Sequence, residues 1–407
     1  MTKKRAYVAA LAGVAIAAAA CGSSSSGGNT AASTPPAASS APAASSSAPA
    51  APSISANSFT RDFSAMAALK SLAAQGKGSV GVILPDTTSS ARWAEFDAPY
   101  LTQAFEAAGL SASQISVKNA QGSDSTFVTD AEADITNGAS VLLTDPEDPG
   151  TGGRVATYAA QHGVKVIDYD RITQGAYYIS FNNVQVGKLI GQGFASCVAK
   201  WKVAKPDLIK MVGAPTDNNA TQFAKGYDGV ISAHPSWKVA ASPPGTWTPS
   251  VALTEFEQAF TANPGVNSAV IPNDENAAPI ITYLKNHGIK PNTFPITGQD
   301  ATLIGFQNML TGYQCGTAYK PIYLEAQAAA AVAMYVRAGQ TPPSSLVNAT
   351  TANPNNGNKA MPSVLLTPEW VTPSTIASTV IKDQFVTAKQ LCTAAYKAAC
   401  SANGISG

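Results

Sequence analysis

From Ser79 onward, short apolar runs alternate with segments whose apolar residues recur at helical spacing. The runs Ser79–Leu84 (SVGVIL), Ser140–Thr144 and Val164–Tyr169 are predicted strands, and Asp124–Thr136 and Arg154–His162 are predicted helices. Most of these runs do not alternate with polar residues, which is typical of parallel strands buried on both faces. Strands and helices in alternation predict a doubly wound parallel sheet.

The chain then continues with a second series of the same kind. The first series also includes a predicted helix at Arg92–Ala108 and a predicted strand at Ile115–Lys118. The predicted strands of the second series are Leu208–Val212, Ser268–Pro272 and Pro295–Gly298. Its predicted helices are Val184–Cys197, Thr221–Ser232, Ala252–Thr261, Asn276–Asn286 and Leu303–Leu310. Two series of this length indicate two α/β lobes rather than one very wide sheet.

The N-terminal region does not follow this pattern. A basic start, Lys3–Arg5, precedes an apolar stretch from Ala6 to Ala20 that is too short to span a bilayer comfortably. Residues 1–20 are therefore a predicted signal peptide. Cys21 resembles the modified cysteine of bacterial lipoproteins, which is diacylated and becomes the first mature residue, although Ala18 replaces the usual Leu. Ordinary secretion with an incidental cysteine is the alternative.

The segment after Cys21 is a predicted tether. From Gly22 to about Asn57 it consists almost entirely of Ser, Ala, Pro and Gly, which have little to bury in a core. We expect residues 21–62 to form the lipid anchor and a disordered linker. A cell-wall spacer without a further role is compatible with this composition.

The composition of the whole chain bears on its partner. Charged residues make up 13% of the 407 residues, about half the usual share, and the formal net charge is +1. Such a chain has little electric field with which to attract nucleic acid. We therefore expect a neutral partner and no nucleic acid.

Four cysteines remain besides Cys21, and in an exported chain they can form two disulfides. Three pairings are possible, and the sequence alone does not distinguish them. Our hypothesis pairs Cys392 with Cys400, which closes a short terminal loop, and Cys197 with Cys315, which fall in one predicted lobe.

Sequence signals for catalysis, metals and cofactors are missing. No two histidines have zinc spacing, and no Walker A or nucleophile-elbow sequence occurs. His162 and His287 each precede a glycine at a predicted helix end, where histidine suits the helix dipole. The loop Pro149–Gly153 is expected to be a turn, with anion binding at a helix start as the alternative. We expect no metal, no cofactor and no enzyme activity.

Polar side chains gather at the predicted strand ends, where open α/β sheets bind their ligands. These groups are Arg92-Trp93, Asp170-Arg171, Asp217-Asn218-Asn219, Asn273-Asp274, Gln299-Asp300 and Lys320. Sugar hydroxyls both donate and accept hydrogen bonds, so a sugar site combines carboxylates and amides with cationic donors. The apolar faces of a pyranose favour flat aromatic side chains. Helix N-capping is the alternative for each Asp and Asn, but it does not explain Arg92-Trp93 or Lys320.

In order and spacing, these groups resemble the periplasmic-type sugar-binding proteins of ABC transporters, within the ribose/galactose-binding family, and especially its D-xylose-binding members. The resemblance runs from about Ser79 to Asp383 and also includes Tyr178–Asn182, Trp247 and Ala259–Asn263. The chain departs from the pattern by one inserted residue between Gly81 and Arg92 and by Glu275-Asn276 after Asp274. Both departures leave the exact sugar open.

The resemblance implies a role for each matching residue. It implies that Trp93 and Trp247 sandwich the sugar ring. The hydroxyl-binding residues that it implies are Arg92, Asp170, Arg171, Asp217, Asn219, Asn273, Asp300 and Lys320, with Asn218 as a secondary candidate.

The resemblance also implies the domain organisation, a periplasmic binding protein type I fold with two lobes joined by a three-crossing hinge. The first predicted lobe is 63–179 plus 321–361, the second is 180–320 plus 362–391, and 392–407 is a C-terminal tail. We expect a monomer, anchored to the outer face of the cell membrane, that captures a monosaccharide such as D-xylose and delivers it to an ABC transporter permease. A sugar-sensing module for a membrane receptor and a secreted glycosidase are the alternatives.

Overall fold

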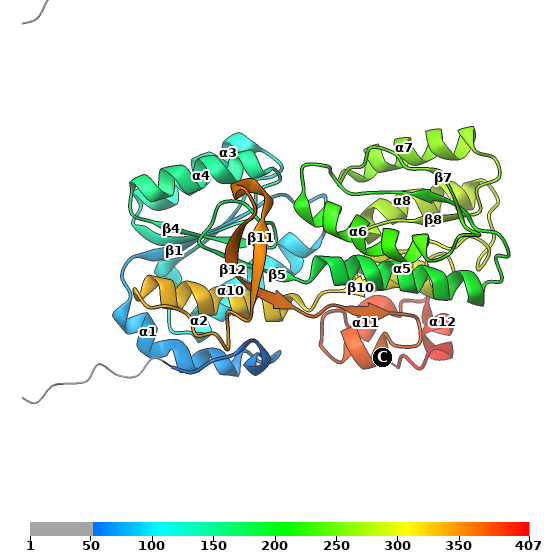
Figure 1. The fold of residues 1–407 in the computed structure, drawn as a ribbon. Coiled ribbons are helices and arrows are strands. Elements are labelled where there is room, and N and C mark those ends of the chain that lie inside the picture. Colours follow the sequence, from blue (N-terminus) through cyan, green and yellow to red (C-terminus); the bar gives the residue numbers. More distant parts are fainter. Residues whose placement is uncertain (1–51, 407) are drawn as a thin grey trace, which may run out of the picture. The chain divides into compact units, whose positions relative to one another are not determined.

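The computed structural model describes residues 52–406 (Figure 1). The predicted signal peptide, Cys21 and the linker up to residue 51 lie outside the described residues. Within 52–406, none of the helices combines the length and the apolar character that a membrane crossing requires.

The first lobe is built on a seven-stranded sheet. Its strands, in spatial order, are β11 (Ala349–Asn353), β12 (Lys359–Leu366), β5 (Tyr177–Phe181), β4 (Lys165–Tyr169), β3 (Ala139–Thr144), β1 (Ser79–Leu84) and β2 (Ile115–Asn119). All neighbouring pairs are parallel except β11–β12, which is an antiparallel hairpin at one edge. The predicted parallel sheet is confirmed, and the hairpin is an addition that the strand pattern did not predict.

Both faces of this sheet are buried, which explains the continuous apolar runs. Val80 and Val82 of β1 belong to the core cluster that includes α10 residues, whereas Ile83 packs in a separate cluster with Phe127 and Leu142. Figure 1 shows the corresponding layers, with α3 and α4 over one face and α2 and α10 over the other. The helices are α1 (Lys70–Gln75), α2 (Ala98–Ala107), α3 (Asp124–Thr136), α4 (Pro149–Gln161) and α10 (Ile322–Arg337).

Helix α10 was not predicted because it lacks an amphipathic pattern. Thirteen of its sixteen residues are buried, including Glu325 and Gln327, so apolar residues occupy nearly every side. A helix that is apolar all round is a buried helix, and its sequence shows no period of 3.6.

The second lobe contains shorter strands in two three-stranded sheets. One sheet has the order β7 (Lys238–Ala241), β6 (Asp207–Lys210), β8 (Ser268–Val270), and the other has β13 (Glu369–Val371), β10 (Thr317–Tyr319), β9 (Gly298–Gln299). A parallel bridge between Ala269 and Ile296 connects them. The helices of this lobe are α5 (Asn183–Lys200), α6 (Asn218–Ser232), α7 (Pro249–Ala262), α8 (Asp274–Asn286) and α9 (Leu303–Leu310).

The strand pairing places the lobe boundaries differently from the sequence. Residues 363–366 of β12 pair with 178–181 of β5, so the predicted boundaries at 179/180 and 361/362 cut through strands of the first sheet. We therefore propose lobe one as 52–181 plus 321–366 and lobe two as 182–320 plus 367–406. The chain then crosses three times, before α5, between β10 and α10, and between β12 and β13, as can be followed in Figure 1.

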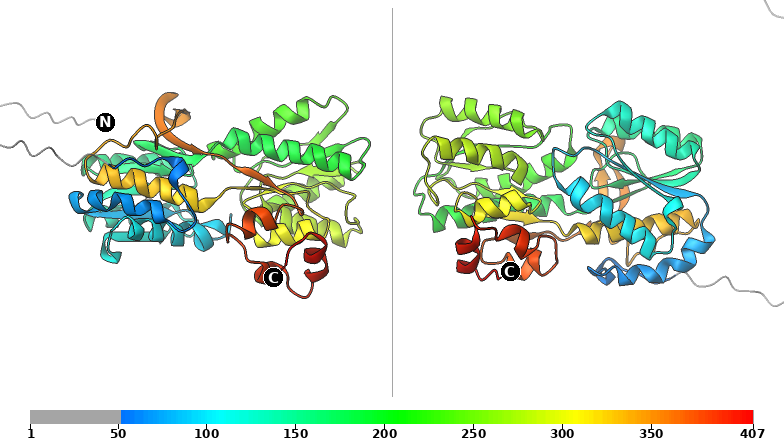
Figure 2. Two further views of the ribbon diagram at one scale, coloured as in Figure 1. Left: turned by 90° about the horizontal axis from the view of Figure 1, so that it is seen from below. Right: turned by 180° about the vertical axis from the view of Figure 1, so that it is seen from behind.

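Both ends of the described chain contain buried residues, although the N-terminal end was predicted to be disordered. Ile54 and Phe59 are buried, and the Ser345 hydroxyl donates to the Ile54 carbonyl, so a disordered linker through residue 62 is wrong for 52–62. The other end forms two short helices, α11 (Ala388–Leu391) and α12 (Lys397–Ala402). Cys400 of α12 is buried, and so is Ile405, which follows α12. Figure 2 shows this C-terminal segment against lobe two.

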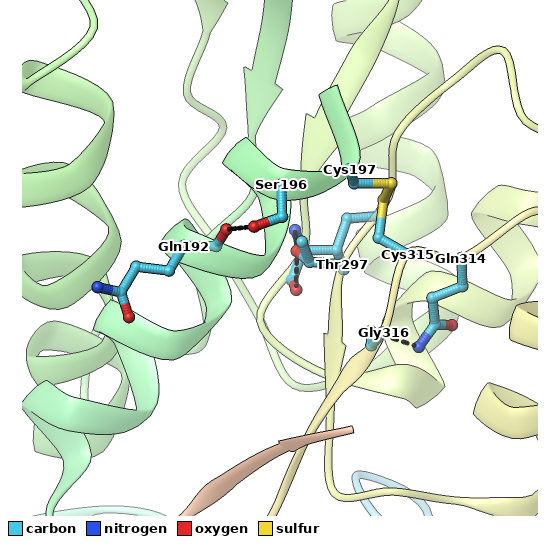
Figure 3. Close-up of a disulfide and its surroundings, with 8 residues drawn as sticks. Gln192, Ser196, Cys197, Thr297, Gln314, Cys315 and Gly316 are labelled. Carbon is cyan, nitrogen blue, oxygen red and sulfur yellow. Dashed lines mark hydrogen bonds between the residues drawn. A yellow bond between two sulfur atoms is a disulfide. The ribbon is translucent and has the colours of Figure 1, made fainter. Parts of the chain in front are cut away.

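Among residues 52–406 two disulfides occur, with the pairings of our hypothesis. Cys197 of α5 is bonded to Cys315, which precedes β10, and the two are 118 residues apart in sequence. Cys392 and Cys400 are eight residues apart and connect the last two helices. Figure 3 shows that the first bond fixes α5 to the segment Gln314–Gly316, which leads into the second crossing between the lobes.

Other local predictions have simple outcomes. His162 and His287 lie at the C-caps of α4 and α8, and the glycine after each has a positive φ. The Pro149–Gly153 segment is the first turn of α4, and Asp148 accepts hydrogen bonds from its free N–H groups. Because the Asp148 carboxylate already accepts these hydrogen bonds, the start of α4 has no open site for an anion.

Candidate ligand-binding site

All ten side chains predicted to contact the ligand line one cavity between the lobes. The predicted residues are Arg92, Trp93, Asp170, Arg171, Asp217, Asn219, Trp247, Asn273, Asp300 and Lys320. The cavity measures only about 30 Å³, because charged side chains from the two lobes pair across it. Asn218 does not line this cavity.

Arg92 is the most buried cation of the site. It precedes the π-helical turn Trp93–Asp97 and pairs with three carboxylates of the same lobe. Its Nη2 is 2.7 Å from Oδ1 of Asp97 and 2.7 Å from Oε2 of Glu325, and its Nη1 is 2.8 Å from Oδ1 of Asp170. Burial alone would lower the pKa of Arg92, but these carboxylates raise it well above the ordinary value. Arg92 is therefore a permanently charged and rigid donor.

Asp170 directly follows β4 and lines the cavity. Its φ of 58° lies in the left-handed region, which Asp tolerates better than most residues. Burial opposes its ionisation, but Arg92, Lys320 and Arg171 lower the pKa of Asp170 to about 2. The carboxylate is consequently ionised at neutral pH and accepts hydrogen bonds.

Arg171 connects the lobes. Its Nη1 donates to Oδ1 of Asp145 at 3.2 Å within lobe one, and its Nε donates to Oδ2 of Asp217 in lobe two at 3.1 Å. Asn219 makes a second connection, since its Nδ2 donates to Oδ2 of Asp170 at 3.1 Å. These contacts hold the lobes in a closed arrangement.

Asp217 and Asn273 both cap helices and line the cavity, so the two alternatives offered by the sequence do not exclude each other. Oδ1 of Asp217 accepts from the Asn219 amide at the start of α6, while Oδ2 is left to accept from Trp247 Nε1 at 2.9 Å. At α8, Oδ1 of Asn273 accepts from the Asn276 amide, and its Nδ2 donates to the Ser89 carbonyl in lobe one at 3.1 Å. In each residue, one side-chain atom is fixed by capping the helix, and the other side-chain atom is left to form contacts at the cavity.

Lys320 lies where the second crossing begins, and Asp300 lies in the connection between β9 and α9. The Lys320 ammonium is 3.2 Å from Oδ1 of Asp300 and 3.8 Å from Oδ1 of Asp170. Oδ2 of Asp300 accepts from the Ser90 hydroxyl of lobe one at 3.1 Å. Gln299 donates to Asp300, and its own Oε1 is buried without a partner within residues 52–406. This amide oxygen is available to accept from a ligand.

Two tryptophans from different lobes complete the lining. Trp93 is buried against both arginines, whose guanidinium carbons are 4.3 Å (Arg92) and 5.1 Å (Arg171) from its ring centroid. Trp247 is partly buried and lies on Gly213, where a Cβ would come within 2.1 Å of the indole. A glycine at position 213 therefore lets the indole lie flat on the backbone.

The structure adds four lining residues that were not among the predicted contacts, Ser89, Ser90, Phe223 and Gln299, of which the sequence had marked only Gln299 as a polar residue at a strand end. Ser89 and Ser90 belong to the loop before Arg92, and Gln299 precedes Asp300, so adjacency to predicted residues was the available signal. Phe223 lies one helical turn after Asn219 on α6, where its apolar character indicated core packing. Within residues 52–406, no group of three or more His, Cys, Asp or Glu side chains is suited to hold a metal ion.

Comparison with known proteins places the chain in a family. A model of the periplasmic binding protein domain matches residues 80–341, more than half of the chain. The chain belongs to the periplasmic binding protein family. It is 35% identical over 280 residues to the D-xylose-binding periplasmic protein of Escherichia coli, a match that covers 67% of this chain and 81% of the relative.

Two further relatives agree with this assignment. A multiple sugar-binding periplasmic protein of Azospirillum brasilense is 29% identical over 338 residues, which is 78% of this chain and 92% of the relative. A solute-binding protein of a carbohydrate transporter from Chloroflexus aurantiacus, solved with D-glucose, has a TM-score of 0.66 at 25% identity and covers 77% and 98% of the two chains. The family consists of extracytoplasmic binding proteins rather than enzymes.

Proposed function

We propose that this chain captures a monosaccharide, with D-xylose as the preferred ligand, and delivers it to an ABC transporter. The observation that carries the proposal is the cavity itself, in which Trp93 of lobe one and Trp247 of lobe two join a ring of charged donors and acceptors. Aromatic faces suit the C–H faces of a pyranose, and the mixed polar lining suits hydroxyls that donate and accept at once.

The proposed course of binding is based on the contacts between the lobes. In the closed arrangement Arg171 pairs with Asp217, and Asn219 pairs with Asp170. A sugar that enters the open cleft takes over part of these hydrogen bonds and satisfies donors of both lobes at once. Ligand binding therefore shifts the equilibrium toward closure, because only the closed form offers contacts from both sides.

The choice of a pentose rests on the relatives. The Escherichia coli relative is named for D-xylose, whereas the Azospirillum relative is named for multiple sugars and the Chloroflexus structure contains D-glucose. All ten residues that the resemblance implies as sugar contacts line the cavity, which supports xylose first. The chain departs from the xylose-binding pattern between Gly81 and Arg92 and at Glu275-Asn276, so the hexoses belong in the same test.

Titration calorimetry against D-xylose, L-arabinose, D-ribose, D-glucose and D-galactose tests this function. We expect a 1:1 complex with D-xylose as the tightest ligand and no change in the sugar after incubation. Tighter binding of a hexose would move the assignment to that sugar, and absence of binding to every aldose would refute the proposal. Cleavage of an oligosaccharide would instead indicate the glycosidase alternative.

The membrane attachment is also a proposal, since Cys21 lies outside the described residues. We propose signal-peptide removal before Cys21, diacylation of its thiol and attachment of a monomer to the outer face of the membrane. Mass spectrometry of the mature N-terminal peptide should show the lipid, and an unmodified Cys21 would contradict it. Affinity capture from membranes separates a permease partner from a sensory receptor.

A further inference from the structure

Glu275 connects the lobes without lining the sugar cavity. It belongs to the first turn of α8 in lobe two, and its Oε1 accepts a hydrogen bond from the Ala91 amide of lobe one at 3.1 Å. Ala91 directly precedes Arg92 and Trp93, two of the proposed sugar contacts. The bond therefore fixes the start of the segment that carries those contacts against the opposite lobe.

The second oxygen of the Glu275 carboxyl group, Oε2, has no hydrogen-bond partner among the described residues. Glu275 as a residue is partly exposed, but its Oε2 is buried. No cation in residues 52–406 forms a salt bridge with it, because Arg92 and Lys320 pair with other carboxylates. An unpaired buried carboxylate is costly, so burial favours its neutral form.

The charges around Glu275 act in the same direction. Burial, and then the negative charges of Asp300 and Asp274, raise the pKa of Glu275 well above its ordinary value. Asp300 lies in the connection between β9 and α9, and Asp274 precedes Glu275 on α8, so both carboxylates come from lobe two. The lobe-one segment that meets Glu275 contributes the Ala91 N–H, whose hydrogen bond lowers the pKa of Glu275, but the effect of burial is larger.

We propose that Glu275 is a protonated latch, whose contact with the Ala91 amide couples lobe closure, and hence sugar binding, to the uptake of one proton. Opening separates Glu275 from Ala91 and exposes the carboxyl group to water, which favours its ionisation although Asp274 and Asp300 remain beside it. Closing buries it again and restores the proton. The link between the latch and sugar binding rests on the proposed function, whereas the latch itself is a property of the two lobes.

Two other buried acids, Asp274 and Glu325, have partners within their own lobe. Burial raises the pKa of Asp274 to about 7, but its hydrogen-bond donors Thr302, Gln314 and Thr317 all belong to lobe two. Burial also raises the pKa of Glu325, to about 8, and its partner Arg92 belongs to the same lobe. These partners persist when the lobes separate, whereas Glu275 loses its contact with Ala91.

The pH dependence has a definite sign. The closed form has the higher pKa of Glu275, so its full advantage is present below the pKa of the open form and is lost as pH rises through the pKa of the closed form. Between these limits sugar affinity should fall by up to about tenfold per pH unit, and binding should take up about one proton. Calorimetry with D-xylose in phosphate and in Tris at one pH measures the proton count, since the apparent enthalpy includes buffer ionisation.

Three variants separate the latch from a packing role. Glu275→Gln keeps an acceptor for Ala91 but cannot titrate, so it should bind without proton uptake and more tightly than the native protein at pH 8. Glu275→Ala lacks the acceptor and should bind more weakly at every pH, again without uptake by this group. Glu106→Gln removes an exposed glutamate of lobe one and should behave like the native protein.

A measurement without sugar keeps the latch testable if the proposed function fails. The radius of gyration from small-angle scattering should decrease from pH 8 to pH 5.5 in the native protein and stay small at both values in Glu275→Gln. A native radius independent of pH, or the same pH dependence in Glu275→Gln, would overturn the latch even if D-xylose binds. Absence of binding to every aldose, with the expected change in radius, would overturn the sugar assignment alone.

Discussion

The two lobes hold their cavity residues in different ways. In lobe one, Arg92 is fixed by Asp97, Asp170 and Glu325, all of the same lobe, above a continuous seven-stranded sheet. In lobe two, Asp217 and Asn273 are fixed as helix caps, and their remaining atoms reach lobe one. Lobe one therefore presents a preorganised surface, whereas the polar contacts of lobe two are completed by closure.

The sheet of lobe one is also more continuous than the sheets of lobe two. Lobe two has strands of two to four residues in two parts that a single bridge connects, and a disulfide ties α5 to the segment before β10. Lobe one contains no disulfide among its described residues. This contrast indicates that the covalent bond supports the lobe whose sheet is less continuous.

Loss of the Cys197–Cys315 bond should have the largest effect on stability. Because the bond closes a loop with a sequence separation of 118, the chain-entropy model gives about 5 kcal/mol for the double Ser variant. The matched double variant of Cys392 and Cys400, with a separation of eight, should lose about 2.5 kcal/mol. Denaturant unfolding checks both values, and equal losses would show that loop length does not explain the difference.

Replacement of Arg92 by Met should come next and should affect lobe one. It leaves three buried carboxylates without their cation, and breaking such a cluster costs about 3–5 kcal/mol. Arg171→Met should cost less, because it leaves two carboxylates rather than three without their cation, and one of them, Asp217, becomes accessible to water when the lobes open. Denaturant unfolding of both variants, with the exposed Arg154→Met as control, checks the order. A reversed order would contradict the view that ion pairs within lobe one are more strongly fixed than those across the lobes.

Trp247→Ala should weaken sugar binding with little loss of stability. The side chain is partly buried at the cavity, and losing a central aromatic contact costs about 2–3 kcal/mol, roughly 30- to 150-fold in affinity. Trp237, partly buried against Phe194 outside the cavity, provides the matched control, and its Ala variant should bind normally. Unchanged affinity of Trp247→Ala in calorimetry would remove this side chain from the site.

Ser90→Ala should have the smallest effect. Its hydroxyl donates across the lobes to Asp300, which keeps its contact with Lys320 in the variant. We expect a loss of about 1 kcal/mol in affinity, roughly fivefold, and no change in unfolding of the sugar-free protein. A loss of stability without a loss of affinity would mean that the bond serves folding rather than closure.

The sequence by itself determined much of the fold. Unbroken apolar runs such as Ser79–Leu84 specified buried parallel strands, because burial on both faces leaves no polar side to alternate. Asp124–Thr136 was predicted with its exact bounds because a partly solvated helix shows its period. Where burial is complete, as in α10, or pairing is remote, as in β11–β12, no local pattern exists, and only the structure revealed these elements.

The candidate site shows the same division. The polar residues at the strand ends, from Arg92 to Lys320, were recognisable because parallel strands bring their carboxyl ends to one edge. Only the tertiary structure decided which atom of Asp217 caps a helix and which faces Arg171, and that Glu275 meets Ala91 across the lobes. The reason is physical: such contacts join segments separated by tens to hundreds of residues, and the sequence does not record which of them meet.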